Sequence, residues 1–576
     1  MLNIYKIKKI LNTKEKKSLK FVFLYSIINS ILEFISIGLL IPIFTTLFSE
    51  KNDKINNFIS YLPFSDLTFY NTMILLSLCF FFLIFVKNTF SLFFVYKQGK
   101  VAFEIRQRLS YDLFSRYLSQ KYSYFFLKKS SVILRNIRAP NSFAVLIASI
   151  VALILDIVIV LVLISFLAYV SLKATLIILI TFGIIIYLFH KYWKKKLYKM
   201  GEEKQNIDAD ITKMISENIL SIKEIIIYGK ESFFLEIFGK KILTDSKLTF
   251  KVEMIQQWPK IVIELLVAAL IFMLIFYLSF LGAPKEDFVF VLGSFSIVAI
   301  RLMPSASRIT QSLQKINFYT PVIDLLYDEF FSEESVMSSV NMQKKAINDN
   351  KKFEKLEIKD VNYSYNETKK VFKGDLNLTI NRGDFIGIYG KSGSGKSTFV
   401  NLITGLLKAN TGKIEVGGQN IQKNIKSWQN IIGYVPQNVY LLDNSISNNI
   451  AFGEQTGMIN KERVNKVAKY SKIDEFVHSL SDKFDTGVGE QGVLVSGGQK
   501  QRIGLARAFY KDPEIIILDE VTVGLDKKIE AEILDLILTL KDKKTFIIVS
   551  HDKNILKNCS KVYSIETNSI IKKNYE

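Results

Sequence analysis

The sequence predicts a chain of two parts: an all-α membrane domain with six spans over residues 1–325, and an α/β domain over residues 353–576. Three observations lead to this fold class. The N-terminal half holds apolar runs long enough to span a bilayer. From residue 353 onward, short β-type runs alternate with helical patterns, and a glycine-rich loop at 390–398 lies between a strand candidate and a helix candidate. Residues 326–352 are polar and charged, and are expected to form a linker.

The composition favours a membrane protein over a soluble or nucleic-acid-binding one. The 576 residues include 75 Lys or Arg and 54 Asp or Glu, a net charge of +21. These cations crowd beside the apolar runs, as in the cytoplasmic loops of membrane proteins, so no nucleic-acid partner is predicted. Cys79 and Cys559 offer neither a disulfide framework nor metal-ligand spacing. Met1–Lys17 is basic and amphipathic with no cleavage site behind the first apolar run, and is expected to be retained.

Six apolar runs fit the length of a membrane-spanning helix, about 20 residues. The predicted spans are 20–47, 67–96, 144–170, 174–193, 258–281 and 286–305. Short connections alternate with two long ones, whose helical patterns predict helices that leave the membrane and return. The long connection after the second span holds ten Lys or Arg and two acidic residues, which predicts a cytoplasmic location. Both termini are then expected inside the cell.

Two short patches inside the long connections, Tyr122–Leu127 and Ser221–Tyr228, are aromatic or aliphatic with polar neighbours. They fit caps that press on another domain. Local packing inside a helical hairpin is an equally good interpretation, because periodicity alone does not separate the two.

Charged residues inside the spans point to function, because each costs about 2.5–3.5 kcal/mol at the centre of a bilayer. The charged positions in or beside the spans are Glu33, Lys87, Lys260, Glu264, Arg301 and Arg308. Four of them are cations, and an excess of cations around a central cavity suits an anionic cargo such as a phosphate or pyrophosphate group. Snorkelling to the interface and Glu–Lys pairing are the alternative interpretation.

The glycine-rich loop fits the G-x-x-x-x-G-K-[ST] pattern of a P-loop. Its residues are Gly390, Lys391, Ser392, Gly393, Ser394, Gly395, Lys396, Ser397 and Thr398. The glycines let backbone N–H groups point at phosphate oxygens above a helix N-terminus. Lys396 is expected to reach the β- and γ-phosphates of a nucleoside triphosphate, and the Ser397 hydroxyl to ligate Mg²⁺.

Further polar residues follow the loop in order. Tyr365, upstream, is placed to stack on the base, and Gln437 to reach Mg²⁺ and the attacking water. A second anion-binding helix start is formed by Ser496, Gly497, Gly498 and Gln499.

The apolar run at 515–518 predicts a buried strand that ends in two carboxylates. Asp519 is expected to hold Mg²⁺, and Glu520 to orient or deprotonate the attacking water. Asp526 follows in a turn, and His551 ends a strand at a position where it can touch the γ-phosphate. The predicted catalytic residues are therefore Glu520, His551 and Gln437.

In this order the motifs resemble the nucleotide-binding domain of an ATP-binding cassette (ABC) transporter. Six spans fused ahead of one such domain resemble an exporter-type half-transporter. The resemblance implies ATP and Mg²⁺ as cofactors, and a domain-swapped homodimer. In such a dimer two ATP molecules lie between the P-loop of one chain and the Ser496–Gln499 signature of the other. ATP-driven closure would rock the membrane halves between inward-open and outward-open states.

The chain departs from the family pattern at two places. Val495 precedes the signature where Leu is usual, which is a conservative change. Val523, Gly524, Leu525 and Asp526 stand where Ser-Ala-Leu-Asp is usual, so a serine hydroxyl used in communication across the dimer is lost. Glu520 is retained, and both sites of a homodimer are expected to be catalytic.

The membrane half is similar to a narrower group, the bacterial flippases of lipid-linked oligosaccharides used in protein N-glycosylation, of the Campylobacter type. The similar stretches are Leu32–Pro42, Pro259–Glu264 and Arg301–Arg308. Where that group carries basic cavity residues, this chain has Lys87, Lys260, Arg301 and Arg308. The resemblance implies an ATP-driven flippase that moves a polyprenyl-pyrophosphate-linked oligosaccharide to the outer leaflet of the bacterial inner membrane.

Two other functions stay open at this point. An exporter of peptides, drugs or other lipids would use the same scaffold with an apolar, aromatic cavity. A non-transport ABC ATPase that acts on DNA or ribosomes is disfavoured by the six fused spans.

Overall fold

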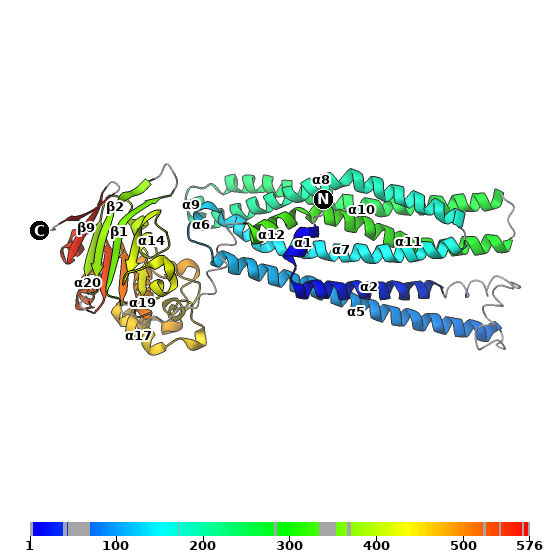
Figure 1. Ribbon diagram of the computed structural model, residues 1–576. Coiled ribbons are helices and arrows are strands. Elements are labelled where there is room, and N and C mark those ends of the chain that lie inside the picture. Colours follow the sequence, from blue (N-terminus) through cyan, green and yellow to red (C-terminus); the bar gives the residue numbers. More distant parts are fainter. Residues whose placement is uncertain are drawn as a thin grey trace. The chain divides into compact units, whose positions relative to one another are not determined.

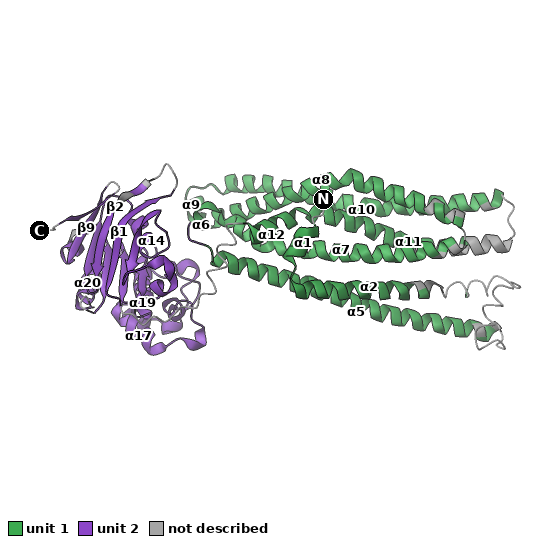
Figure 2. Cartoon of the chain, in the orientation of Figure 1, with its two compact units in different colours: residues 1–120, 125–341 green, residues 121–124, 342–576 purple. Residues whose placement is uncertain are grey.

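The computed structural model describes residues 4–38, 43, 69–170, 172–280, 285–332, 353–365, 370–521, 526–540, 543–566 and 569–573. The chain forms two compact units, which Figure 2 shows in different colours. Unit 1 comprises residues 1–120 and 125–341, and unit 2 comprises residues 121–124 and 342–576.

Unit 1 consists of helices and short connections in the part that the structure describes (Figure 1). Its helices are α1 (Ile4–Ile10), α2 (Thr13–Gly38), α5 (Phe69–Leu118), α6 (Tyr124–Leu127), α7 (Ser130–Val170), α8 (Leu172–Leu220), α9 (Ile222–Ile227), α10 (Glu231–Phe280), α11 (Lys285–Tyr319) and α12 (Pro321–Phe331). The predicted continuation of helices beyond the apolar runs is confirmed. α5, α8 and α10 reach 49 or 50 residues, more than twice the length that spans a bilayer.

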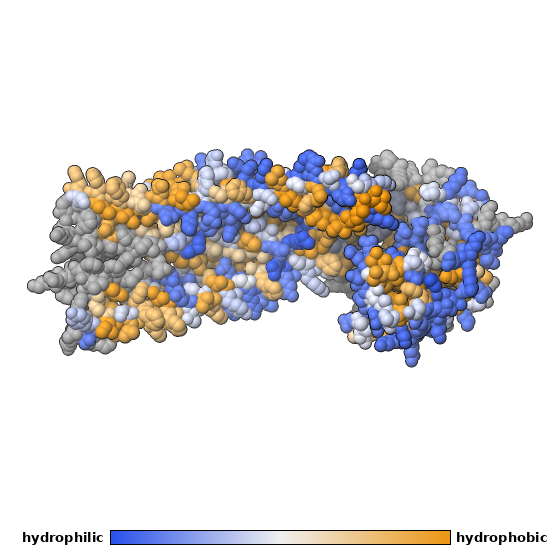
Figure 3. Space-filling model, turned by 180° about the vertical axis from the view of Figure 1, so that it is seen from behind, coloured by the Kyte–Doolittle hydropathy of each residue, from blue (hydrophilic) through white to orange (hydrophobic). Residues whose placement is uncertain are grey.

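Apolar side chains gather at one end of unit 1, the end away from α6 and α9, and hydrophilic ones prevail in its middle (Figure 3). By length and composition, three helical stretches among the described residues can cross a membrane: Met73–Leu118, Ser130–Ser165 and Glu231–Tyr277. The first predicted span, 20–47, runs past the end of α2 into residues of which only Ile43 is described.

α7 packs against α2, α5, α8 and α11, and so organises the core of unit 1. Its Phe143 and Leu146 are fully buried. α5 contributes Ile105, Leu109 and Leu113, which are also fully buried and lie four residues apart. This spacing places the three side chains on one face of the helix, which the rest of unit 1 buries.

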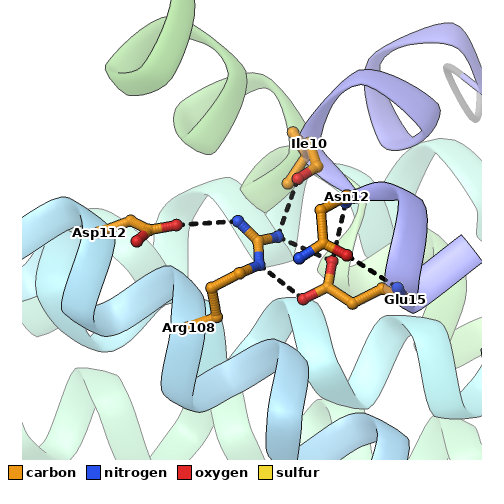
Figure 4. Close-up of polar contacts among 5 residues, drawn as sticks. All are labelled: Ile10, Asn12, Glu15, Arg108 and Asp112. Atoms are coloured by element: carbon orange, nitrogen blue, oxygen red, sulfur yellow. Dashed lines mark hydrogen bonds and ion pairs between the residues drawn. The ribbon is translucent and has the colours of Figure 1, made fainter. Parts of the chain in front are cut away.

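Arg108 of α5 fastens the junction between α1 and α2 (Figure 4). Its Nε and Nη2 donate to the two carboxylate oxygens of Glu15 at 2.6 and 2.8 Å. Nη2 also donates to the Ile10 carbonyl at 3.0 Å, and Nη1 to Asp112 at 2.9 Å. Asn12 and Glu15 cap the start of α2 reciprocally, because each backbone N–H donates to the other side chain. One guanidinium therefore holds three segments together.

The linker is predicted at 326–352, and this predicted start is too early, because α12 continues to Phe331. Leu326 is fully buried. Glu329 accepts hydrogen bonds from the Tyr117 hydroxyl at 2.8 Å and from Lys128 at 2.5 Å. These partners lie about 200 residues away in the sequence, and they keep a charged, polar-looking segment helical.

Unit 2 contains two sheets, and the predicted α/β fold is confirmed. The first is antiparallel, in the order β2-β1-β4-β5, and the second has the order β10-β9-β3-β8-β7-β6. The strands are β1 (Lys355–Ser364), β2 (Lys370–Asn381), β3 (Phe385–Tyr389), β4 (Thr411–Val416), β5 (Gln419–Asn420), β6 (Ile432–Val435), β7 (Ile515–Asp519), β8 (Thr545–Val549), β9 (Lys561–Glu566) and β10 (Ser569–Lys573).

The helices of unit 2 surround these sheets. They are α14 (Lys396–Ile403), α15 (Ile425–Asn430), α16 (Ile446–Ile450), α17 (Lys461–Tyr470), α18 (Asp474–Ser479), α19 (Gly497–Tyr510), α20 (Lys527–Leu540) and α21 (Lys553–Lys557). Strands β3, β6, β7 and β8 are parallel neighbours. Their residues are almost all buried, as in a parallel sheet covered on both faces. Parallel strands end at the same edge, so the residues that follow these four strands meet there.

Candidate nucleotide-binding site

The P-loop joins the end of β3 to the start of α14. Gly393 and Gly395 have φ angles of +79° and +109°, which side-chain-bearing residues rarely adopt. Gly395 is the N-cap of α14 and provides no side-chain cap, so the first N–H groups of the helix keep their donor capacity. A Cβ added at Gly390 would lie 2.5 Å from the Ile565 carbonyl oxygen. The loop therefore has the shape of an anion cradle.

Ser394 contributes a buried hydroxyl to the cradle. Its Oγ makes no hydrogen bond to the part of the chain that the structure describes, although a buried hydroxyl normally has a partner. Ser397, in the first turn of α14, is exposed. These hydroxyls, the uncapped helix start and Lys396 together fit the phosphates of a nucleotide.

Lys396 lies at the centre of the site, with a side chain only 9% exposed. Its Nζ donates to the Gly390 carbonyl at 2.8 Å, lies 2.9 Å from His551 Nε2 and is 4.0 Å from a Glu520 oxygen. Burial lowers the pKa of Lys396 below its usual value, and the nearby Glu520 and Asp519 carboxylates oppose this effect. A phosphate group in the cradle would add negative charge next to this ammonium and stabilise its protonated form.

Glu520 is held on both sides. His551 Nε2 lies 3.1 Å from its Oε1, and Gln437 donates to its Oε2 at 2.6 Å. The backbone of Glu520 has a φ of +51°, which is uncommon for a residue other than glycine. Backbone strain of this kind persists only where the surroundings hold it, and it clusters at functional sites. The carboxylate is thus fixed between the ends of three strands.

Asp519, the last residue of β7, is 8% exposed. Burial raises the pKa of its carboxyl group above the usual value, and the neighbouring Glu520 charge raises it further. A divalent cation would favour the ionised form and reverse this effect.

Gln501 of α19 is a residue that the sequence analysis missed. Its Nε2 donates to the backbone carbonyl of Gln437 at 2.6 Å, and its side chain is buried. This bond ties α19 to the segment after β6 and fixes the direction in which the Gln437 side chain leaves the backbone. The sequence contains a signal for this role. Gln501 lies on a face of α19 that is otherwise apolar, and a polar side chain buried on such a face needs a hydrogen-bond partner.

The remaining predicted residues with a described position are Tyr365, the Ser496–Gln499 signature and Asp526. The Tyr365 hydroxyl is 3.2 Å from Thr398 Oγ1, and its ring is partly exposed. Ser496 is the N-cap of α19 and forms a capping box with Gln499, with Gly497 and Gly498 as the first helical residues. Asp526 is exposed. Among contacts of the described residues, none joins the signature to the P-loop of the same chain. Val523, Gly524 and Leu525 lie outside the described residues.

The structure pairs two of the four predicted cargo cations with carboxylates. Lys87 forms an ion pair with Glu33 at 2.5 Å, both side chains being 14% exposed, so the pairing interpretation holds there. Arg308 contacts Asp156 through Nε at 2.9 Å and Nη2 at 2.7 Å. The sequence analysis missed Asp156, although it is the one acidic residue in the third predicted span.

The other two cations differ. Lys260 is exposed and forms no ion pair within the part of the chain that the structure describes. The side chain of Arg301 lies outside the described residues.

Comparisons with known proteins define the class. Residues 36–286 match the model of the ABC transporter transmembrane region, and residues 374–523 match the model described as ABC transporter. The structure of a bacterial Atm1-family ABC exporter with ATP bound superposes with a TM-score of 0.75, covering 97% of this chain and 94% of that one at 17% identity. The chain is an ABC exporter half-transporter with a helical transmembrane domain and an α/β nucleotide-binding domain. The two matched models indicate ATP binding and ATPase-coupled transport.

Particular relatives include ATP-dependent lipid A-core flippases. That of Coxiella burnetii is 28% identical over 411 residues, 70% of this chain and 67% of the relative. That of Legionella pneumophila (strain Paris) is 29% identical over 394 residues, 68% of this chain and 64% of the relative. A putative multidrug export ATP-binding/permease protein of Staphylococcus aureus is 37% identical over 218 residues, 38% of this chain and 37% of the relative. The chain thus spans about two thirds of the flippases it matches. These relatives do not confirm the narrower resemblance to N-glycosylation flippases.

Proposed function

We propose that this chain is an ATP-driven flippase that moves a polyprenyl-pyrophosphate-linked oligosaccharide from the cytoplasmic to the outer leaflet of the bacterial inner membrane. Three findings support the proposal: the ABC exporter fold, relatives named as flippases of lipid A-core, and cations on the long apolar helices. The termini and unit 2 would then lie in the cytoplasm.

Lys260 carries the argument for an anionic cargo. It lies on α10, within a stretch able to cross a membrane, and is exposed without an ion-pair partner among the described residues. A charge in such a helix normally faces a watery cavity or a partner, since the bilayer does not stabilise it. We assign Lys260 to the pyrophosphate of the cargo. Arg308 is a second candidate, because its side chain is 51% exposed although Asp156 occupies two of its nitrogens.

For ATP hydrolysis, the geometry supports a role for each residue around Glu520. Glu520 is placed to accept a proton from the attacking water, with Gln437 and His551 holding its two oxygens. Lys396 would hold the β- and γ-phosphates, and Tyr365 the base. We assign Mg²⁺ to Ser397, Asp519 and Gln437, where it would neutralise developing phosphate charge. His551 would contact the γ-phosphate.

A homodimer would complete the ATP site. The Ser496–Gln499 signature has no described contact with the P-loop of its own chain, which leaves it available to a partner chain. The end of unit 1 that carries α9 also exposes apolar side chains, visible as an orange patch in Figure 3. Around α9 these are Ile219, Leu220, Ile222, Ile226, Ile227 and Tyr228, each at least 51% exposed. Exposed apolar patches of this kind mark interaction sites, and we assign this one to unit 2 of the partner chain.

Reconstituted flipping tests the cargo assignment. Lys260 and Arg301 are both changed to Ala, and ATP-dependent flipping of a lipid-linked oligosaccharide is measured in proteoliposomes alongside ATPase activity. Flipping should fall about tenfold or more, because each lost charge-assisted hydrogen bond is worth roughly 1.5–3 kcal/mol. The control changes Lys213 of α8 and Lys240 of α10, two lysines that are paired with Glu217 and Glu236. Unchanged flipping in the Lys260/Arg301 variant would refute the cationic cargo site.

A drug exporter is the second candidate, favoured by the similarity to the multidrug export protein of S. aureus. It predicts ATPase stimulation by apolar drugs that is indifferent to Lys260. Drug stimulation without any stimulation by lipid-linked oligosaccharide would select it.

A further inference from the structure

Four exposed lysines lie together on α8, where its apolar half gives way to its polar half. Lys191, Lys194, Lys195 and Lys196 form this α8 lysine cluster. Just before it, Ile184 and Leu188 are 53% and 56% exposed, as expected of side chains that contact acyl chains. The cluster therefore lies at the level where a bilayer's hydrocarbon meets its head groups.

An aromatic pair joins this level of α8 to α10. The rings of Trp193 and Trp258 lie 6.4 Å apart at 85°, and Tyr192 packs edge-on against Trp193 at 5.1 Å. Trp258 and Tyr192 are 51% and 70% exposed. Trp and Tyr with exposed rings are typical of membrane interfaces, because the ring is amphipathic. Lys196 Nζ lies 4.8 Å from the centre of the Trp193 ring, so Lys196 and the aromatic pair form one surface.

Among the described residues, no carboxylate forms an ion pair with the cluster lysines. The sequence from Leu172 to Gly201 contains no Asp or Glu. Lys204, two turns further along α8, is the contrast, because Asp245 of α10 and Asp208 contact its Nζ at 2.5 and 3.1 Å. On the same two helices, carboxylates thus neutralise Lys204, whereas no described carboxylate pairs with the four cluster lysines.

We propose that the α8 lysine cluster, with Trp193 and Trp258, binds the phosphate head group of an anionic glycerophospholipid from the inner leaflet. The phosphate complements the uncompensated charge, and the acyl chains continue along the apolar half of α8 and α10. Because the aromatic pair bridges the two helices, the bound lipid contacts both. The four cluster lysines are not among the cargo cations, and the proposal does not depend on what the protein transports.

The chain's three tryptophans allow a direct test. Trp193 and Trp258 lie in the site, and Trp428 is buried in the core of unit 2. The full-length protein is placed in bilayers of phosphatidylglycerol and phosphatidylcholine, with bromine on the acyl chains of one lipid at a time at equal mole fraction. We expect brominated phosphatidylglycerol to quench the fluorescence more strongly, with an apparent preference of about threefold or more that weakens at high salt.

Three variants locate the preference. With all four cluster lysines changed to Ala the two brominated lipids should quench equally, whereas Lys→Arg at the same positions should keep the preference. Changing the paired lysines Lys213 and Lys240 to Ala should also leave it intact. Equal quenching by both lipids in the wild-type protein, or a preference that survives the Ala changes, overturns the proposal. So does quenching that persists after W193F and W258F are combined. ATP and cargo are absent from this measurement, so its failure leaves the proposed transport function untouched.

Discussion

Glu520 combines a strained backbone with a side chain held at both oxygens. Its φ is +51°, and His551 and Gln437 contact its carboxylate from two other strand ends. The sequence motif alone predicts an acidic residue after a buried strand. Its orientation follows from residues 31 and 83 positions away, so the motif cannot provide it.

Glu520→Gln is the first prediction. The amide keeps the size of the side chain but cannot accept a proton, so ATPase activity should fall about 10²- to 10⁴-fold, while ATP affinity, measured by nucleotide titration, stays within a few-fold. Glu462→Gln, an exposed carboxylate on α17, is the matched control and should leave turnover unchanged. Turnover near the wild-type rate in the Glu520 variant would show that another group serves as the base.

At the scale of elements, one arginine holds the N-terminal helices in place. Arg108 reaches the two oxygens of Glu15, the Ile10 carbonyl and Asp112, and Glu15 is 4% exposed. A planar guanidinium can satisfy acceptors in several directions at once, whereas a lysine ammonium is a compact charge at a single point. α1 has only seven residues and depends on this junction and on contacts with α12.

Arg108→Lys should therefore release α1 while leaving the rest of unit 1 folded. We expect a loss of about 1.5–3 kcal/mol in the local opening free energy, because charge-assisted hydrogen bonds are removed. The measurement is hydrogen exchange of residues 4–15 in detergent or nanodiscs. Arg106→Lys, at an exposed position on the same helix, is the control. Equal protection of residues 4–15 in both variants would contradict the role given to Arg108.

Local sequence patterns predict some elements of the fold, but they do not predict the contacts between distant residues. The long helices and the P-loop follow from local patterns: hydropathy for the spans, and glycine spacing for the loop. Asp156 with Arg308 and Glu33 with Lys87 are 152 and 54 residues apart, and no local pattern pairs them. The extension of α12 past residue 325 depends likewise on distant partners of Glu329. Gln501 acquires its role only because α19 packs beside β6.

For the whole molecule, the proposed homodimer makes each ATP site a product of two chains. Lys396 of one chain and Ser496 of the other would face the same nucleotide. Ser496→Asp is the sharpest probe of the signature, because Asp is also a good N-cap and preserves the start of α19. Its negative charge would repel the γ-phosphate. Lys396→Ala removes the corresponding cation from the P-loop side.

Co-purified dimers of two differently tagged chains decide whether the sites are shared. With Lys396→Ala on one chain and Ser496→Asp on the other, both defects fall in one site and the second site is intact. With both changes on one chain and a wild-type partner, each site carries one defect. We expect the first dimer to retain roughly half of the wild-type ATPase activity and the second to lose about 10²-fold or more. The opposite ranking would mean that each P-loop works with the signature of its own chain. The proposal that each ATP site is shared between two chains would then be wrong.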